Sequence, residues 1–115
     1  MNIIVVGDGK VGLSITAQLS REGHNLTVID SNSSVLETSV EQYDVMTLHG
    51  NGASLPVLRE AKAETADLLI AATSTDEVNL LTCILARRLG ATINLDDMTH
   101  IDLLSGICGI PETIS

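Results

Sequence analysis

The segment Ile3-Ile4-Val5-Val6-Gly7-Asp8-Gly9-Lys10-Val11-Gly12 combines an apolar run with three closely spaced glycines. Four consecutive β-branched residues, Ile3 to Val6, predict a short strand buried on both faces, as a parallel sheet requires. Apolar residues at every fourth position, namely Val11, Ile15 and Leu19, then predict a helix. The segment therefore predicts a strand, a tight turn and a helix in succession.

The glycine spacing is G-x-G-x-x-G, which is typical of turns that bind the diphosphate of a dinucleotide. Gly7 would permit the tight turn, Gly9 would let a pyrophosphate approach the backbone, and Gly12 would let the helix pack closely on the strand. The phosphates would contact main-chain N–H groups at the positive end of the helix dipole. Lys10 could reach a terminal phosphate, although a solvated lysine at a helix start explains it equally well. A glycine-rich turn without a ligand is the alternative for the whole pattern.

Predicted strands and helices alternate along the following part of the chain. Apolar runs predict three more strands, over residues 25–30, 44–49 and 67–73, with helical segments between and after them. Such alternation implies right-handed βαβ crossovers. The sequence therefore predicts an α/β fold with a doubly wound parallel sheet, Rossmann-like, in three α/β/α layers.

Capping patterns predict where these helices begin. Ser34-x-x-Glu37 and Ser74-x-x-Glu77 are capping boxes. Ser54 is a predicted N-cap of a short helix, in whose first turn Pro56 is tolerated. The last helix is predicted to carry four apolar side chains on one face: Val78, Leu81, Leu85 and Leu89.

Polar residues lie at the carboxyl ends of the predicted strands, where doubly wound sheets bind their ligands. Asp30 lies 18 positions after Gly12, near the spacing at which dinucleotide-binding domains place an acid. Its carboxylate would accept hydrogen bonds from both ribose hydroxyls and repel a 2′-phosphate, which favours NAD or adenosine ligands over NADP. An ordinary turn aspartate is the alternative. Asn51 lines the adenine side or is a plain turn residue, and Thr73 and Ser74 end the fourth strand.

Composition disfavours several other functions. Six basic against fifteen acidic residues give a net charge of −9, and one Tyr without Phe or Trp offers little for base stacking, so nucleic-acid binding is not expected. No apolar window is long enough to insert into a membrane. Cys83 and Cys108 lack metal-ligand spacing, and no motif of a catalytic residue set is present, so neither a metal site nor a catalytic residue is predicted.

Four segments together resemble the N-terminal lobe of RCK domains, also called KTN domains, of Trk-type potassium-uptake regulatory subunits. They are Met1–Gly12, Val28-Ile29-Asp30, the run GNGASLPVLREA at 50–61 and the run TSTDEVN at 73–79. The resemblance covers residues 1–91, which it marks as a nucleotide-binding lobe. Residues 92–115 are predicted to be a divergent tail, either a fifth strand or a short helix.

The resemblance implies a cytoplasmic regulator rather than an enzyme. Such a regulator would bind NAD or NADH, with ATP or ADP as alternatives. It would assemble as a homo-oligomer, a dimer or larger, at the inner face of the membrane beneath a potassium-transporter subunit, and gate that transporter by ligand-dependent conformational change. By position, phosphates would be held by Gly7, Asp8, Gly9, Lys10 and Val11, the ribose by Asp30, and the far side of the ligand by Thr73 and Ser74.

Two other interpretations stay open at the level of sequence. The chain could be the cofactor-binding fragment of an NAD-dependent dehydrogenase, which would need a substrate domain beyond Ser115. It could also be an oligomerisation lobe that has lost its ligand, because the arginines that family members carry after the position of Ala91 are absent.

Overall fold

The computed structural model describes residues 1–7 and 9–89 of the chain. Its strands are β1 (Asn2–Val6), β2 (Asn25–Asp30), β3 (Met46–His49) and β4 (Leu68–Ala71). Its helices are α1 (Lys10–Arg21), α2 (Ser33–Gln42), α3 (Leu55–Glu60), the 3-10 turn η1 (Ala63–Thr65) and α4 (Asp76–Leu89). The predicted tail at 92–115 lies outside the described residues, and the predicted domain boundary at residue 91 stays a prediction.

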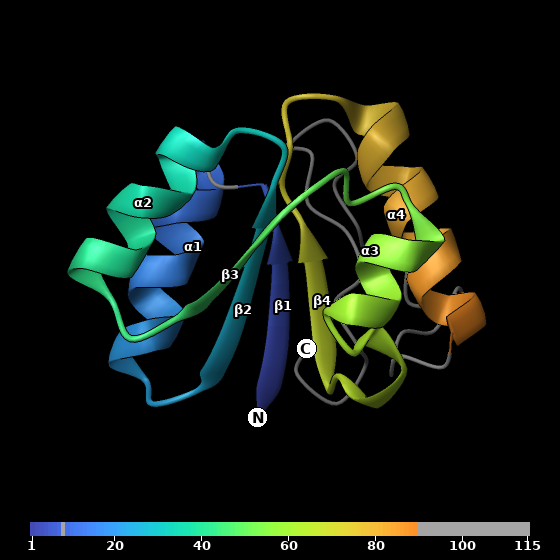
Figure 1. The fold of residues 1–115 in the computed structure, drawn as a ribbon. Helices are drawn as coiled ribbons and strands as arrows, with labels where there is room; N and C mark the ends of the chain where they lie inside the picture. Colours follow the sequence, from blue (N-terminus) through green and yellow to red (C-terminus); the bar gives the residue numbers. More distant parts are fainter. Residues whose placement is uncertain (8, 90–115) are drawn as a thin grey trace.

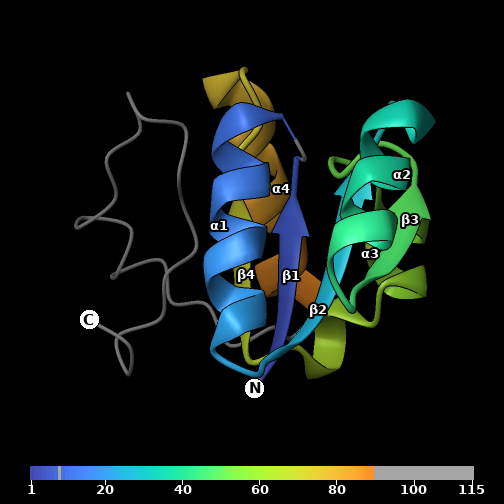
Figure 2. The same ribbon diagram turned by 90° about the vertical axis from the view of Figure 1, so that its left-hand side faces the viewer.

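The described strands form one parallel sheet in the order β3-β2-β1-β4, so β1 lies between β2 and β4. Helices α1 and α2 cover one face of this sheet, and α3 and α4 cover the other (Figure 1). Viewed from the side of α1 and α2, both helices lie in front of the strands (Figure 2). The predicted Rossmann-like α/β fold in three layers is therefore confirmed.

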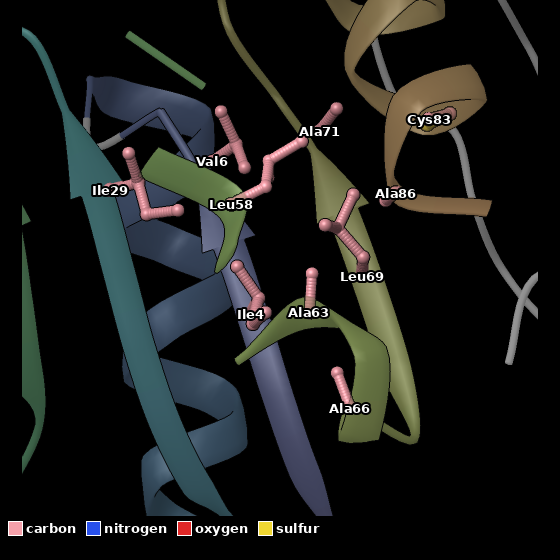
Figure 3. Close-up of a cluster of buried hydrophobic side chains, with 10 residues drawn as sticks. All are labelled: Ile4, Val6, Ile29, Leu58, Ala63, Ala66, Leu69, Ala71, Cys83 and Ala86. Atoms are coloured by element: carbon pink, nitrogen blue, oxygen red, sulfur yellow. The ribbon is translucent and has the colours of Figure 1, made fainter. Parts of the chain in front are cut away.

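The β-branched run of β1 is buried on both faces, as its sequence predicts. Ile4 and Val6 point to the side of α3 and α4, where they join Leu58, Leu69 and Cys83 in one apolar cluster (Figure 3). Ile3 and Val5 belong to a second cluster, against which Ile15 and Leu19 of α1 pack. Because successive side chains of a strand alternate between faces, one strand serves both cores.

Val11 differs from the other two apolar positions predicted for the first helix. Its side chain is 47% exposed, whereas Gly12 and Thr16 are the buried residues of α1. The reason is position: Val11 lies in the first turn of α1, at the carboxyl edge of the sheet, where it borders a cavity instead of the core.

The apolar face predicted for the last helix is only partly turned to the core. Leu81 is 46% exposed, and the buried residues of α4 are Asn79, Thr82, Cys83 and Ala86. Leu85 and Leu89 do pack against the core, at its border. The side of α4 that packs most closely on the sheet thus carries small and polar residues rather than the leucines.

Two of the predicted caps are also wrong. Asn32, not Ser34, caps α2, and its side chain accepts a hydrogen bond of 3.0 Å from the Ser34 amide. Helix α4 begins at Asp76, so Ser74 lies in the loop before it. Ser54 is the N-cap of α3 as predicted, but within the described part of the chain its side chain makes no capping hydrogen bond.

The strands agree closely with the predicted ranges. Strand β2 spans the predicted residues, while β3 and β4 are shorter than predicted by two and three residues respectively. Among the described residues, no helix is long and apolar enough to cross a membrane.

Candidate functional site

A cavity of about 600 Å³ lies at the carboxyl edge of the sheet, the upper edge in Figure 1. The ends of β1, β2 and β4 and the loop after β3 all contribute to its lining. Eight of the ten residues predicted for the site lie in this lining: Gly7, Gly9, Lys10, Val11, Asp30, Asn51, Thr73 and Ser74. Of the other two, Gly12 lies beneath the turn and Asp8 lies outside the described residues.

The turn after β1 needs glycine at two positions for geometric reasons. Gly7 has a φ of +102°, and an added Cβ would lie 2.9 Å from the carbonyl carbon of Ala72. A Cβ on Gly12 would lie 1.7 Å from the carbonyl oxygen of Gly7. Gly12 therefore lets α1 approach the turn, which is the role predicted for it from the pattern.

Gly9 is different, because an added Cβ there would meet no described atom within 4 Å. Its backbone borders the cavity, and its φ of −73° is available to any residue. Packing within the described protein therefore does not require glycine at this position.

The N-terminus of α1 opens onto the same cavity. The first main-chain hydrogen bond of the helix runs from the Leu13 amide to the Gly9 carbonyl, at 2.8 Å. The amides of Lys10, Val11 and Gly12 precede it and belong to the first turn, whose donors lack partners within the helix. The first turn contains no acidic residue, and Lys10 lines the cavity. These donors, together with the helix dipole, suit an anion.

Asp30 is held firmly at the end of β2. One carboxylate oxygen accepts a hydrogen bond of 2.7 Å from the Asn32 amide, and the carbonyl oxygen of Asp30 accepts one of 2.9 Å from the Gly50 amide. The neighbouring strand adds a further contact, since Nε2 of His49 lies 2.8 Å from the carbonyl oxygen of Ser31. The carboxylate is thus fixed on the wall of the cavity by local turns.

The sheet order places Asp30 and Thr73 on opposite sides of the glycine turn. Asp30 ends β2, Thr73 follows β4, and β1 with its turn lies between them. On the β3 side, Asn51 both lines the cavity and forms a turn, because its side chain accepts a hydrogen bond of 2.9 Å from the Ala53 amide. The hydrogen bond agrees with the turn interpretation of Asn51, and its contact with adenine stays a prediction.

The sequence prediction missed eight lining residues: Val6, Ile29, Ser31, Gly50, Gly52, Ala72, Thr75 and Val78. The predicted strand ends carried the signal for Val6, Ile29 and Ala72, and the runs at 50–52 and 73–75 carried it for Gly50, Gly52 and Thr75. Ser31 and Val78 had no distinguishing pattern.

Two charged side chains stand among the described lining residues, Lys10 and Asp30. Among residues 1–7 and 9–89, no group of three or more His, Cys, Asp or Glu side chains is arranged to hold a metal ion. The cavity combines main-chain N–H donors of α1 in its middle, the carboxylate of Asp30 on one side and the hydroxyl-bearing Thr73 and Ser74 on the other.

A parallel sheet whose strand ends meet at such a glycine turn defines a Rossmann-like domain of the dinucleotide-binding class. The sequence model of the TrkA-N domain matches residues 3–115, and the chain belongs to this family. The predicted resemblance to the N-terminal lobe of Trk-type regulatory subunits is therefore confirmed, and it favours a regulatory domain over a dehydrogenase fragment.

Two curated relatives carry the same family name. The Trk system potassium uptake protein TrkA homolog of Methanothermobacter thermautotrophicus is 37% identical over 87 residues, which are 76% of this chain and 40% of that protein. The Trk system potassium uptake protein TrkA of Halomonas elongata is 41% identical over 92 residues, which are 80% of this chain and 20% of that protein. The chain thus spans well under half the length of these relatives.

Two solved structures are similar in fold. The Kef CTD of Shewanella denitrificans in its AMP-bound form matches with a TM-score of 0.65 and 27% identity, over 76% of this chain and 52% of that one. The GsuK channel bound to NAD matches with a TM-score of 0.70 over 91% of this chain and 20% of that one. At 18% identity, the second likeness shows the fold alone.

Proposed function

We propose that this chain is the nucleotide-binding domain of a potassium-uptake regulatory protein and that it binds NAD or NADH at the carboxyl edge of its sheet. The observation that carries the proposal is the sheet order. It puts the bare N-terminus of α1 in the middle of the cavity, Asp30 on one side and Thr73 on the other. A dinucleotide has the same plan, with a central diphosphate between two nucleosides.

Each of the ten predicted site residues has a role in this proposal. The diphosphate lies on the backbone of Gly7, Gly9 and Val11 with Lys10 as counter-charge, and Gly12 keeps α1 close enough to present its amides. Asp8, assigned by the family resemblance alone, completes the turn. Asp30 accepts both hydroxyls of the adenosine ribose, Asn51 borders the adenine, and Thr73 and Ser74 border the second nucleoside.

Adenine mononucleotides are a second candidate for the same cavity. AMP, ADP or ATP would use Asp30 and the glycine turn and leave the side of β4 unfilled. The AMP-bound state of the Kef domain, which is 27% identical, favours this candidate. The two candidates differ in whether the β4 side contributes to affinity.

The regulatory part of the proposal follows from the family. The chain would act in a homo-oligomer, a dimer or larger, attached to a membrane potassium-transporter subunit at the cytoplasmic side. Exchange of one nucleotide for another would gate that transporter. Such exchange shifts the transporter only if the nucleotides differ in affinity for two conformations of the domain. The relatives' names, which refer to potassium uptake, support this assignment.

The direct test is a ligand panel on the purified chain, using isothermal titration calorimetry and thermal unfolding with NAD, NADH, NADP, AMP, ADP and ATP. A ligand at about 100 times its Kd stabilises the native state by about 2.7 kcal/mol, which is readily seen as a rise in Tm. We expect NAD or NADH to bind and NADP to bind more weakly. Unchanged unfolding with all six ligands would contradict the proposal and favour the oligomerisation lobe.

A further inference from the structure

The side chain of Asn79 does not line the cavity, but it forms hydrogen bonds with a residue that does. It belongs to the first turn of α4 and is 1% exposed. A buried amide of this kind is costly unless its hydrogen bonds are satisfied. Its partners therefore show what the position is for.

Three hydrogen bonds join the Asn79 side chain to Thr73, in the loop after β4. The Asn79 Oδ1 atom accepts hydrogen bonds from the Thr73 amide at 2.9 Å and from the Thr73 hydroxyl at 2.6 Å. The Asn79 Nδ2 atom donates to the Thr73 carbonyl at 3.1 Å. One carboxamide thus holds the amide, the carbonyl and the hydroxyl of a residue that lines the cavity.

This arrangement limits what Thr73 can offer to a ligand. Its main-chain N–H donates to the Asn79 oxygen, and its hydroxyl has acceptors within the fold in the Asn79 oxygen at 2.6 Å and the Thr75 carbonyl at 3.2 Å. The hydroxyl oxygen also accepts a bond of 3.2 Å from the Thr75 amide, which closes the loop around it. Thr73 therefore presents oxygen acceptors, which suit a ligand group that donates, such as a ribose hydroxyl or a carboxamide, and do not suit a phosphate.

We propose that Asn79 is a positioning residue for the β4 side of the nucleotide site and that it fixes Thr73 and Ser74 to receive the second nucleoside of a dinucleotide. The inference rests on the proposed function and adds the residue that selects dinucleotides over mononucleotides. The side chain type matters, because only a carboxamide supplies both the acceptor and the donor that the Thr73 main chain requires. In an aspartate, a carboxylate oxygen would replace the Nδ2 donor and lie against the Thr73 carbonyl oxygen, so that two acceptors would face each other.

The test compares NAD with AMP on the full chain, since AMP fills only the β2 side and the glycine turn. In Asn79→Ala we expect the Kd for NAD to rise about tenfold while the Kd for AMP changes by less than about twofold, because only the β4 side loses its shape. Thr73→Val, which keeps the main-chain bonds, should show the same selective loss to a smaller extent. Thr73→Ser, which keeps the hydroxyl, should bind NAD with the same Kd as the unaltered chain.

Thr82→Val is the matched control on the same helix. Its hydroxyl is buried and has no hydrogen-bond partner among the described residues, so the isosteric change should leave both Kd values unaltered. Cooperative thermal unfolding shows whether each variant is folded. If Asn79→Ala is unfolded, the comparison of Thr73→Val with Thr73→Ser tests the inference in its place.

Two outcomes would overturn the inference. One is an unchanged Kd for NAD in folded Asn79→Ala or, if that variant is unfolded, in Thr73→Val. The other is an equal loss of NAD and AMP binding. If the unaltered chain binds neither nucleotide, the proposed function fails and the inference fails with it.

Discussion

Asp30 has two tasks at the scale of the single residue. One of its carboxylate oxygens holds the Asn32 amide in a turn, and the same carboxylate lies on the wall of the cavity. A substitution that removes both tasks at once cannot show which one matters. The structure offers a variant that separates them.

Asp30→Asn keeps an oxygen for the Asn32 amide and removes the charge, whereas Asp30→Ala removes both. Hydrogen bonds to a charged group are worth about 1.5–3 kcal/mol, so we expect either change to weaken NAD binding by about 10- to 100-fold. Asp30→Asn should keep the Tm nearly unchanged and reduce the preference for NAD over NADP, because the repulsion of a 2′-phosphate is gone. Calorimetry with both dinucleotides checks this. An unchanged preference would remove the role assigned to the carboxylate.

Substitutions of Gly9 and Gly12 should affect different properties of the protein, nucleotide binding and stability respectively. In Gly12→Ala the new methyl group would lie 1.7 Å from the Gly7 carbonyl oxygen, so α1 must move, and we expect a loss of about 1–3 kcal/mol in the free energy of unfolding. Gly9→Ala meets no described atom within 4 Å and should leave stability nearly unchanged while weakening nucleotide binding. Urea unfolding and calorimetry on both variants separate the effects. Equal loss of stability would contradict the distinction between them.

The boundaries of the elements show where sequence patterns succeed and where they fail. The run Ile3–Val6 and the glycine spacing predicted β1, the turn and α1, because the signals are local and strong. The apolar pattern of α4 was less informative, because it includes Leu81, which is 46% exposed, and leaves out Asn79, which is buried and binds Thr73. A pattern of apolar residues does not reveal a buried polar side chain of this kind.

The beginning of α2 gives a test at the scale of the element. The structure assigns the cap to Asn32, while the sequence pattern assigned it to Ser34. Replacing a capping Asn by Ala costs about 1 kcal/mol, so Asn32→Ala should lower the free energy of unfolding by that amount. Ser34→Ala loses only an exposed hydrogen bond of 2.7 Å from its hydroxyl to Asn32, so it should lower the free energy of unfolding by less than half as much as Asn32→Ala. Chemical denaturation checks the order, and a larger effect of Ser34→Ala would restore the capping box.

At the scale of the whole molecule, the order β3-β2-β1-β4 gathers residues from four separate parts of the chain at one edge. The sequence predicted most of this edge, since strand ends could be located and the parallel arrangement followed from the alternation. It did not predict Ser31 and Val78, and it gave no sign that Thr73 forms hydrogen bonds with Asn79. The direction of a side chain depends on its hydrogen-bond partners in the folded chain, which the residue type alone does not identify.

With a net charge of −9, the molecule has no overall attraction for an anionic nucleotide. The account therefore requires that the turn at residues 7–12 supply the attraction locally, through its amides and Lys10. The most direct measurement is a titration of ¹⁵N-labelled protein with NAD, followed by amide chemical shifts. The account predicts the largest shifts at Gly7, Gly9, Lys10 and Val11, followed by residues next to Asp30 and Thr73. Saturable binding with the largest shifts at the opposite, amino edge of the sheet would contradict it.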